Sequence, residues 1–287
     1  VIVGQEQTVD LVLTAILANG HVLIEGVPGV AKTLLARLTA RLIDADFSRV
    51  QFTPDLMPSD VLGTTVFNMK TNGFDFHQGP IFADIVLVDE INRAPAKTQA
   101  ALFEVMEERQ ISIDGTTHRM GDLYTILATQ NPVEQEGTYK LPEAQLDRFL
   151  MKITMDYPSL EEEVNILERH HTNAALVKLD DITPAITKEE LLSLRAFMNQ
   201  VFVDRTLLQY IALIVQQTRT SKAVYLGASP RASVAMLQSS KAYALLQGRD
   251  FVTPEDIKFV APYVLQHRLI LTAEAEMEGY SPVKVTQ

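Results

Sequence analysis

The stretch GVPGVAKT, from Gly26 to Thr33, restricts the fold of this chain more than any other feature. It follows the apolar run HVLIEG at 21–26 and precedes TLLARLTARL at 33–42, whose apolar residues have helical spacing. A glycine-rich loop between a strand and a helix presents backbone N–H groups at a helix N-terminus, where phosphate oxygens bind. The usual pattern G-x-x-x-x-G-K-[ST] has glycine before its lysine, whereas this chain has Ala31. The match is therefore either accidental or a loop that accepts a methyl group.

The first half of the chain alternates buried-strand patterns with helical patterns. The strand patterns are the apolar runs at 21–26, 48–53, 84–90 and 123–132, and the helical ones lie at 33–42 and 96–109. Near-continuous apolar runs are typical of parallel strands that helices cover on both faces. The alternation therefore predicts a three-layer α/β domain with a parallel sheet.

After residue 157 the sequence predicts helices almost throughout. Helix starts are indicated by Ser159 with Glu162, Thr187 with Glu190, Ser229 with Pro230, and Thr253 with Pro254. Gly248 suits the end of a helix. We therefore expect an α/β domain over 1–157 and a helical domain over 158–287.

Two turn signals interrupt the α/β pattern. Asn72-Gly73 lies within TTVFNMKTNGFDFHQ (64–78), and Asp114-Gly115 lies within RQISIDGTTHRM (109–120). Both predict β-hairpins, because a two-residue type I′ turn needs residues that tolerate positive φ. From the residues alone, these are either plain surface hairpins or functional inserts.

Composition narrows the partners and the compartment. The chain has 287 residues, no Cys and a net charge of -11. The lack of Cys excludes disulfides and thiolate metal sites and predicts a reducing, cytoplasmic setting. The acidic balance argues against nucleic acid bound through a generally basic surface. No apolar run approaches the roughly 20 residues of a membrane span, and the N-terminus lacks a secretory pattern, so we expect no membrane insertion.

The residues after the loop carry the expected chemistry. Lys32 would reach the β- and γ-phosphates of a nucleotide, and the Thr33 hydroxyl would bind Mg²⁺. The run IVLVDE ends in Asp89 and Glu90, which would hold the metal and activate water respectively. Such an acidic pair is often only a helix cap when it stands alone. Downstream of a phosphate loop in the same α/β domain, it predicts an ATP site.

Three further polar residues have a plain and a functional interpretation. Asn131 either shapes a turn before Pro132 or positions the attacking water. Arg148, in LPEAQLDRFL, is either a surface ion-pair partner or a functional cation. Arg231, in GASPRA, lies in the first turn of a predicted helix, where a cation and free N–H groups would face an anion.

With these pieces placed, the chain resembles the MoxR family of AAA+ ATPases along nearly its whole length. The most specific stretches are DLMPSDVLGTTVF, GPIFADIVLVDEINRAPAKTQAALFEVMEERQ, LATQNPVEQEGTYKLPEAQLDRF and GASPRA. The resemblance implies an AAA+ P-loop NTPase αβα domain followed by an all-α lid. It also makes Ala31 a family variant, since MoxR-like loops commonly carry Ala before the lysine.

The resemblance also implies roles for individual residues. Asp89 and Glu90 match the Walker B pair, Asn131 sensor 1, Arg231 sensor 2, and Arg148 an arginine finger that acts on a neighbouring subunit's nucleotide. The implied nucleotide-binding residues are Val3, Gly4, Gly26, Val27, Pro28, Gly29, Val30, Ala31, Lys32, Thr33 and Leu34, with Thr33 and Asp89 at the metal. The two hairpins match the helix-2 and pre-sensor-1 inserts, which face the pore in relatives.

The function that the resemblance implies is ATP-driven, chaperone-like remodelling by a ring, most commonly a hexamer. Its partners would be a protein client and a von Willebrand factor A domain protein. Two alternatives stay open, a nucleic-acid motor and a metal-insertion motor subunit like that of magnesium chelatase. A σ-factor-dependent activator would carry a GAFTGA loop in the helix-2 insert, and this chain has none.

Overall fold

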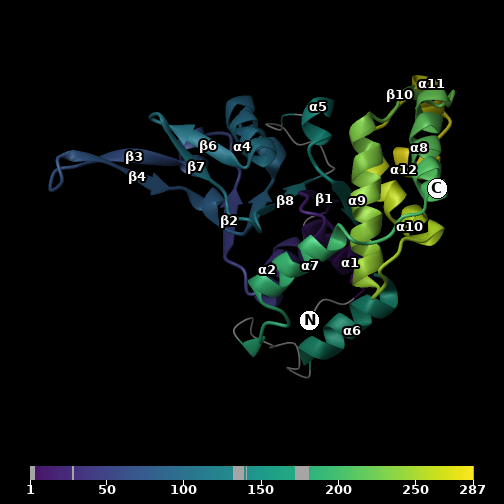
Figure 1. Ribbon diagram of the computed structural model, residues 1–287, viewed down its shortest axis with the longest axis horizontal. Helices are drawn as coiled ribbons and strands as arrows, with labels where there is room; N and C mark the ends of the chain where they lie inside the picture. Colours follow the sequence, from purple (N-terminus) through teal and green to yellow (C-terminus); the bar gives the residue numbers. More distant parts are fainter. Residues whose placement is uncertain (1–3, 28, 132–138, 140, 172–180, 287) are drawn as a thin grey trace. The chain divides into compact units, whose positions relative to one another are not determined.

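The chain folds into two compact units (Figure 1). The computed structural model describes residues 4–27, 29–131, 139, 141–171 and 181–286. Unit 1 comprises the described residues of Val1–Glu6, Leu23–Leu141 and Thr154–Leu192, and unit 2 those of Gln7–Val22, Pro142–Ile153 and Ser193–Gln287. The chain thus passes between the units several times, unlike the single break predicted after residue 157. That break stays a prediction about domain organisation.

A five-stranded sheet is built from the predicted strands and one more. Its order is β2-β5-β8-β1-β9, with β1 at Val22–Gly26, β2 at Phe47–Gln51, β5 at Ile85–Asp89, β8 at Thr125–Gln130 and β9 at Met151–Met155. Strands β2, β5 and β8 pair in parallel, as predicted. The pattern analysis missed β9, which lies at one edge of the sheet.

Position in the sheet decides how far each strand is buried. All residues of β5 are buried, and so are the first five of β8. In β2, by contrast, only Val50 is buried, so the prediction that this strand is covered on both faces is wrong. The reason is that β2 is the other edge strand and has a neighbour on one side only.

Helices and short turns connect these strands. They are α1 (Glu6–Leu17), α2 (Lys32–Leu42), α3 (Pro58–Leu62), α4 (Ala96–Glu108), α5 (Glu143–Leu146), α6 (Leu160–His171) and α7 (Lys188–Met198), with 3₁₀ turns η1 (Pro80–Phe82) and η2 (Ile91–Arg93). The predicted helices at 33–42 and 96–109 correspond to α2 and α4. No helix among the described residues is long and apolar enough to cross a bilayer.

The two hairpins form with different turns. Strands β6 (Gln110–Ile113) and β7 (Thr116–Arg119) enclose the predicted two-residue turn, with Asp114 at φ 49° and Gly115 at φ 79°. Strands β3 (Gly63–Asn68) and β4 (Gly73–Gln78) pair Asn68 with Gly73, so residues 69–72 form a four-residue loop. The two-residue turn predicted at Asn72-Gly73 is therefore wrong, although Asn72 has positive φ. This hairpin projects from unit 1 in Figure 1.

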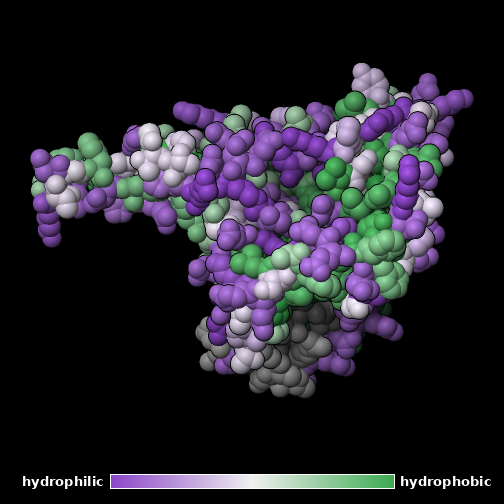
Figure 2. Space-filling model, in the orientation of Figure 1, coloured by the Kyte–Doolittle hydropathy of each residue, from purple (hydrophilic) through white to green (hydrophobic). Residues whose placement is uncertain are grey.

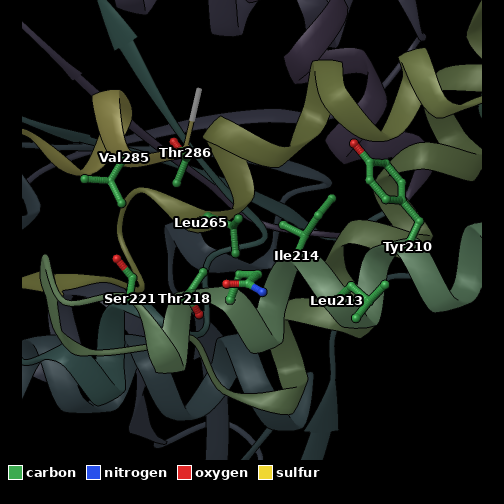
Figure 3. Close-up of a pocket in the computed structure, with 9 residues that line it drawn as sticks. Tyr210, Leu213, Ile214, Thr218, Ser221, Leu265, Val285 and Thr286 are labelled. Atoms are coloured by element: carbon green, nitrogen blue, oxygen red, sulfur yellow. The ribbon is translucent and has the colours of Figure 1, made fainter.

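The C-terminal part of unit 2 is mainly helical, as predicted. Its elements are α8 (Arg205–Thr220), β10 (Val224–Leu226), α9 (Pro230–Leu246), α10 (Pro254–Leu265), β11 (Ile270–Leu271), α11 (Ala273–Met277) and α12 (Pro282–Thr286). Helices α8, α10 and α12 line a pocket of 460 Å³, with Tyr210, Leu265 and Val285 on its walls (Figure 3).

The predicted capping residues lie at helix starts, with one difference. Ser159 with Glu162 and Thr187 with Glu190 form reciprocal side-chain and backbone hydrogen bonds, as predicted. Thr253 caps α10 together with Asp256. Ser229 precedes Pro230 at the start of α9, but its hydroxyl makes no capping hydrogen bond within that helix. The predicted helix start at Ser229-Pro230 is therefore confirmed, although the serine hydroxyl bonds elsewhere.

Ala31 immediately precedes α2 in a left-handed conformation, with φ 58° and ψ 25°. A left-handed backbone places the Cβ atom of an L-residue too close to its own carbonyl oxygen, which costs about 1–2 kcal/mol. Glycine avoids this strain, which explains why most such loops have glycine at the position that Ala31 occupies here.

We expect Ala31→Gly to raise the free energy of unfolding by up to about 1 kcal/mol, because strain relief exceeds the roughly 0.4–1 kcal/mol entropy that glycine adds to the unfolded chain. The matched control is Ala100→Gly in α4, at an exposed helical position, which should lower stability by about 1 kcal/mol. Urea unfolding measures both. Equal losses in the two variants would show that Ala31 is unstrained.

A buried ion pair holds the start of α10. Arg249 donates two hydrogen bonds to the carboxylate of Asp256, one of them 2.8 Å long, and Asp256 is buried. Burial raises the pKa of Asp256, but hydrogen bonds from Arg249 and Thr253 and the Arg249 charge outweigh it, so the pKa lies below 3.8. The carboxylate therefore stabilises the fold above its unfolded pKa, and this contribution is lost as pH falls through the lower folded pKa.

Arg249→Gln should lower the free energy of unfolding at pH 7 by about 3 kcal/mol, because it leaves a buried carboxylate unpaired. This loss of stability should shrink as pH falls below about 4. Asp256 becomes protonated at higher pH in the variant than in the parent protein, and a neutral carboxyl needs no partner. Urea unfolding at pH 7 and near pH 3 tests this, with the exposed Arg205→Gln as control, for which less than about 0.5 kcal/mol is expected. A deficit that does not change with pH would contradict the assignment.

Candidate nucleotide-binding site

The loop between β1 and α2 has the backbone that phosphate binding requires. At Gly26 a Cβ atom would lie 2.8 Å from the Met155 carbonyl oxygen of β9, so close approach of two strands demands glycine there. Gly29 has φ 92°, and nothing lies within 4 Å of where its Cβ would be. Helix α2 begins at Lys32, so its first N–H groups adjoin this open loop. Pro28 lies outside the described residues.

Lys32 lies among three acidic side chains. Its Nζ donates a hydrogen bond of 2.6 Å to the Gly26 carbonyl oxygen. Burial lowers the pKa of Lys32, while the charges of Asp89, Glu90 and Glu25 oppose that shift. The charges of both acids at the end of β5 therefore reach Lys32.

Asp89 and Glu90 end β5 and share a partner from β8. Thr129 Oγ1 donates to Asp89 Oδ1 at 3.1 Å and accepts from the Glu90 N–H at 3.0 Å. Thr129 is buried, so this hydroxyl fixes the turn at the end of β5. Glu90 itself is left-handed, with φ 56° and ψ 51°, a conformation that costs a non-glycine residue about 1–3 kcal/mol and is concentrated at functional sites.

Two arginines pair with these acids. Arg49 of β2 donates from Nε to Asp89 Oδ2 at 2.6 Å, and Arg93 donates to Glu90 Oε2 at 2.8 Å. Arg49, Arg93 and Thr129 were not predicted from the sequence. Thr129 lies near the end of β8, as Asp89 lies at the end of β5. Only the register that pairs Val88 with Ala128 shows that Thr129 adjoins Asp89.

Asn131 directly follows β8 and is half-buried. Strand β8 lies between β5 and β1 in the sheet, so its carboxyl end adjoins both the acidic pair and the phosphate loop. Gln130 Nε2 donates to Glu25 Oε1 at 3.3 Å and so links the ends of β8 and β1. The structure therefore places Asn131 at the same edge of the sheet as Asp89.

The donor set fits a nucleotide with Mg²⁺. The Thr33 hydroxyl and the Asp89 carboxylate are hard oxygen ligands, which Mg²⁺ prefers. Within the described residues no three or more His, Cys, Asp or Glu side chains form a metal cluster.

The remaining predicted residues belong to other segments of the chain. Gly4 has φ 70°, and a Cβ there would clash with the Glu162 carboxylate of α6. Val3 lies outside the described residues. Arg148 and Arg231 both belong to unit 2, where Asp147 and Ser229, which neighbour them in the sequence, are joined by a hydrogen bond of 3.2 Å.

Comparison with known proteins agrees with this geometry. A profile for the ATPase family associated with various cellular activities (AAA) matches residues 21–151, and an AAA lid domain profile matches residues 216–287. The uncharacterized protein YeaC of Bacillus subtilis is 50% identical over 97% of this chain and 86% of its own length. Chaperone MoxR1 of Mycobacterium tuberculosis is 45% identical over 98% of this chain and 76% of its own.

A solved structure also matches this chain. A Cytophaga hutchinsonii protein assigned as an ATPase has a TM-score of 0.91 with this chain at 42% identity, covering 100% of this chain and 88% of that one. Sequence identity of this extent, together with the loop and the acidic pair, shows that the chain belongs to the MoxR family of AAA+ ATPases.

Proposed function

We propose that this protein binds ATP with Mg²⁺ at the edge of the sheet in unit 1. It hydrolyses the bond between the β- and γ-phosphates, which gives ADP and phosphate. The observation that carries this proposal is the geometry of the glycine loop at Gly26 and Gly29, together with the Asp89–Glu90 pair that Thr129 holds at the end of β5. In this site Lys32 and the loop N–H groups hold the phosphates, and Thr33 and Asp89 hold the metal. When bound there, Mg²⁺ would supply positive charge to offset the charge on the phosphate oxygens.

Glu90 and Asn131 act on water. Glu90 accepts the proton of the attacking water, and Asn131 orients that water. Arg93 holds the Glu90 carboxylate at 2.8 Å, and Thr129 holds its backbone, so the base keeps one position. Such fixed positioning is a large part of phosphoryl-transfer catalysis.

Glu90→Gln should keep ATP binding but lower the hydrolysis rate by at least about 100-fold, because the amide cannot accept the proton. Fluorescent nucleotide titration and phosphate release measure the two effects. Lys32→Ala is the comparison variant, and it should lose binding as well. Turnover that persists in Glu90→Gln would show that another group activates water.

A ring completes the site in this proposal. Arg148 reaches the nucleotide of the neighbouring subunit as an arginine finger, and Arg231 contacts the nucleotide of its own subunit. An arginine supplied in trans contributes orders of magnitude in rate, so the assembled ring, most simply a hexamer, is the active form. The family resemblance supports both roles, and it also supports a cytoplasmic setting and a von Willebrand factor A domain partner.

The hairpins support a protein client. In the β3–β4 hairpin Met69 is 89% exposed and Phe74 is 74% exposed, and Figure 2 shows apolar residues along this projecting arm. A pocket of 580 Å³ lies between the two hairpins, where Phe76 stacks on His118 with ring centroids 4.2 Å apart. Exposed apolar side chains beside such a pocket suit an extended apolar polypeptide.

The same hairpin argues against a nucleic-acid motor. Between residues 63 and 78 Lys70 is the only Lys or Arg, and Asp75 is the only Asp or Glu. Binding to phosphate backbones depends on several cations, each of which releases counterions. We therefore propose a chaperone-like remodeller, in line with the relative named Chaperone MoxR1.

Phe74→Ser should weaken binding of a labelled, chemically unfolded protein about tenfold while leaving the basal hydrolysis rate unchanged, because it removes an exposed aromatic anchor. Tyr225→Ser is the control, since Tyr225 is 78% exposed on β10 in unit 2. Fluorescence anisotropy measures the binding. Salt-sensitive binding of single-stranded DNA, with unfolded protein ignored, would instead favour the nucleic-acid motor.

A further inference from the structure

Asp147 links two parts of unit 2 that each carry a functional arginine. Its Oδ1 accepts from Arg268 Nε at 2.6 Å, and its Oδ2 accepts from Ser229 Oγ at 3.2 Å. Asp147 immediately precedes Arg148, and Ser229 lies two residues before Arg231. A single carboxylate therefore connects the segments of both arginines.

Arg268 holds the Arg148 segment along its backbone. The guanidinium also donates to the carbonyl oxygens of Phe149 at 2.7 Å and Leu150 at 3.2 Å, and its side chain is only 4% exposed. His267 adds a contact of 3.0 Å to the Phe149 oxygen, and Gln266 donates to the Lys152 oxygen. Residues 266–268 thus clamp the backbone that follows Arg148, which leaves the segment little freedom to move independently.

The Ser229 hydroxyl is directed to this link instead of to its own helix. Serine at a helix N-terminus usually accepts a hydrogen bond from the first turn, but Ser229 makes none there. It donates instead to the Asp147 carboxylate, which lies 82 residues away in the sequence. Helix capping therefore does not account for this hydrogen bond, whereas a connection between α9 and the Arg148 segment does.

We propose that Ser229, Asp147 and Arg268 form a positioning link that holds Arg148 and Arg231 as one rigid group. A shift of Arg231 with the state of its own subunit's nucleotide is then transmitted to the finger that serves the neighbouring subunit. The link acts through these arginines and touches no substrate itself. This inference rests on the roles proposed above for Arg148 and Arg231.

Rings mixed from two defective variants isolate the link. Glu90→Gln subunits donate a finger but do not hydrolyse, whereas Arg148→Ala subunits hydrolyse but donate no finger. Each is nearly inactive alone, and mixing should restore hydrolysis where a finger meets an intact site. Ser229→Ala is then added either to the finger donor or to the site donor. This substitution leaves the buried ion pair and the helix cap untouched, so the chain should fold normally.

We expect Ser229→Ala to lower kcat of the mixed ring about tenfold in either position, with KM for ATP and the melting temperature unchanged, since small displacements of catalytic groups cost about that much or more. Ser229→Thr, which keeps the hydroxyl, should restore the rate. Ser281→Ala is the matched control, because Ser281 accepts the Lys284 N–H as an ordinary cap of α12. It should lower the melting temperature slightly and leave kcat unchanged.

Three results would overturn the inference. One is an unchanged kcat with Ser229→Ala in both positions, and another is a loss confined to the site donor, which would leave the finger independent of the link. The third is that mixing itself restores no hydrolysis. That outcome refutes the trans role of Arg148 in the proposed function, and the link falls with it.

Discussion

The parallel pairing of β5 with β8 is the constraint on which the nucleotide site depends. It aligns Val88 with Ala128, so the residues that follow, Asp89 and Thr129, lie side by side at the carboxyl edge of the sheet. There the Thr129 hydroxyl bridges the Asp89 carboxylate and the Glu90 N–H. Because parallel strands all end at one edge, the same pairing brings Asn131 and the phosphate loop to these acids. A shift of register by one residue would turn the threonine to the other face of the sheet.

Backbone strain is part of the site. Gly29, Ala31 and Glu90 all have positive φ, and two of the three are not glycine. Such conformations persist only where the surrounding structure holds them. Ala31 is held between the loop and the start of α2, and Glu90 by Thr129 and Arg93. Two left-handed non-glycine residues thus stand at this edge of the sheet, one before α2 and one directly after Asp89.

Much of this arrangement was predictable, and the errors have physical causes. The strands, both hairpins and the acidic pair follow from local apolar periodicity and turn chemistry. The exposure of β2 follows from its edge position, and its polar residues Ser48, Arg49 and Gln51 already differ from the apolar run of β5. The first hairpin turn was missed because Asn-Gly tolerates positive φ in a four-residue loop as well as in a two-residue turn.

The sequence by itself determined the kind of site, since GVPGVAKT, the strand ending in Asp89-Glu90 and the long motifs identify a family and its chemistry. Only the tertiary structure decided which side chains support that chemistry. Arg49 and Thr129 each lie 40 residues from Asp89 in the sequence, and Ser229 reaches Asp147 across 82 residues. A local pattern reveals residues that lie close together along the sequence. A hydrogen bond between distant segments forms only after strand order and helix packing have brought its two atoms together.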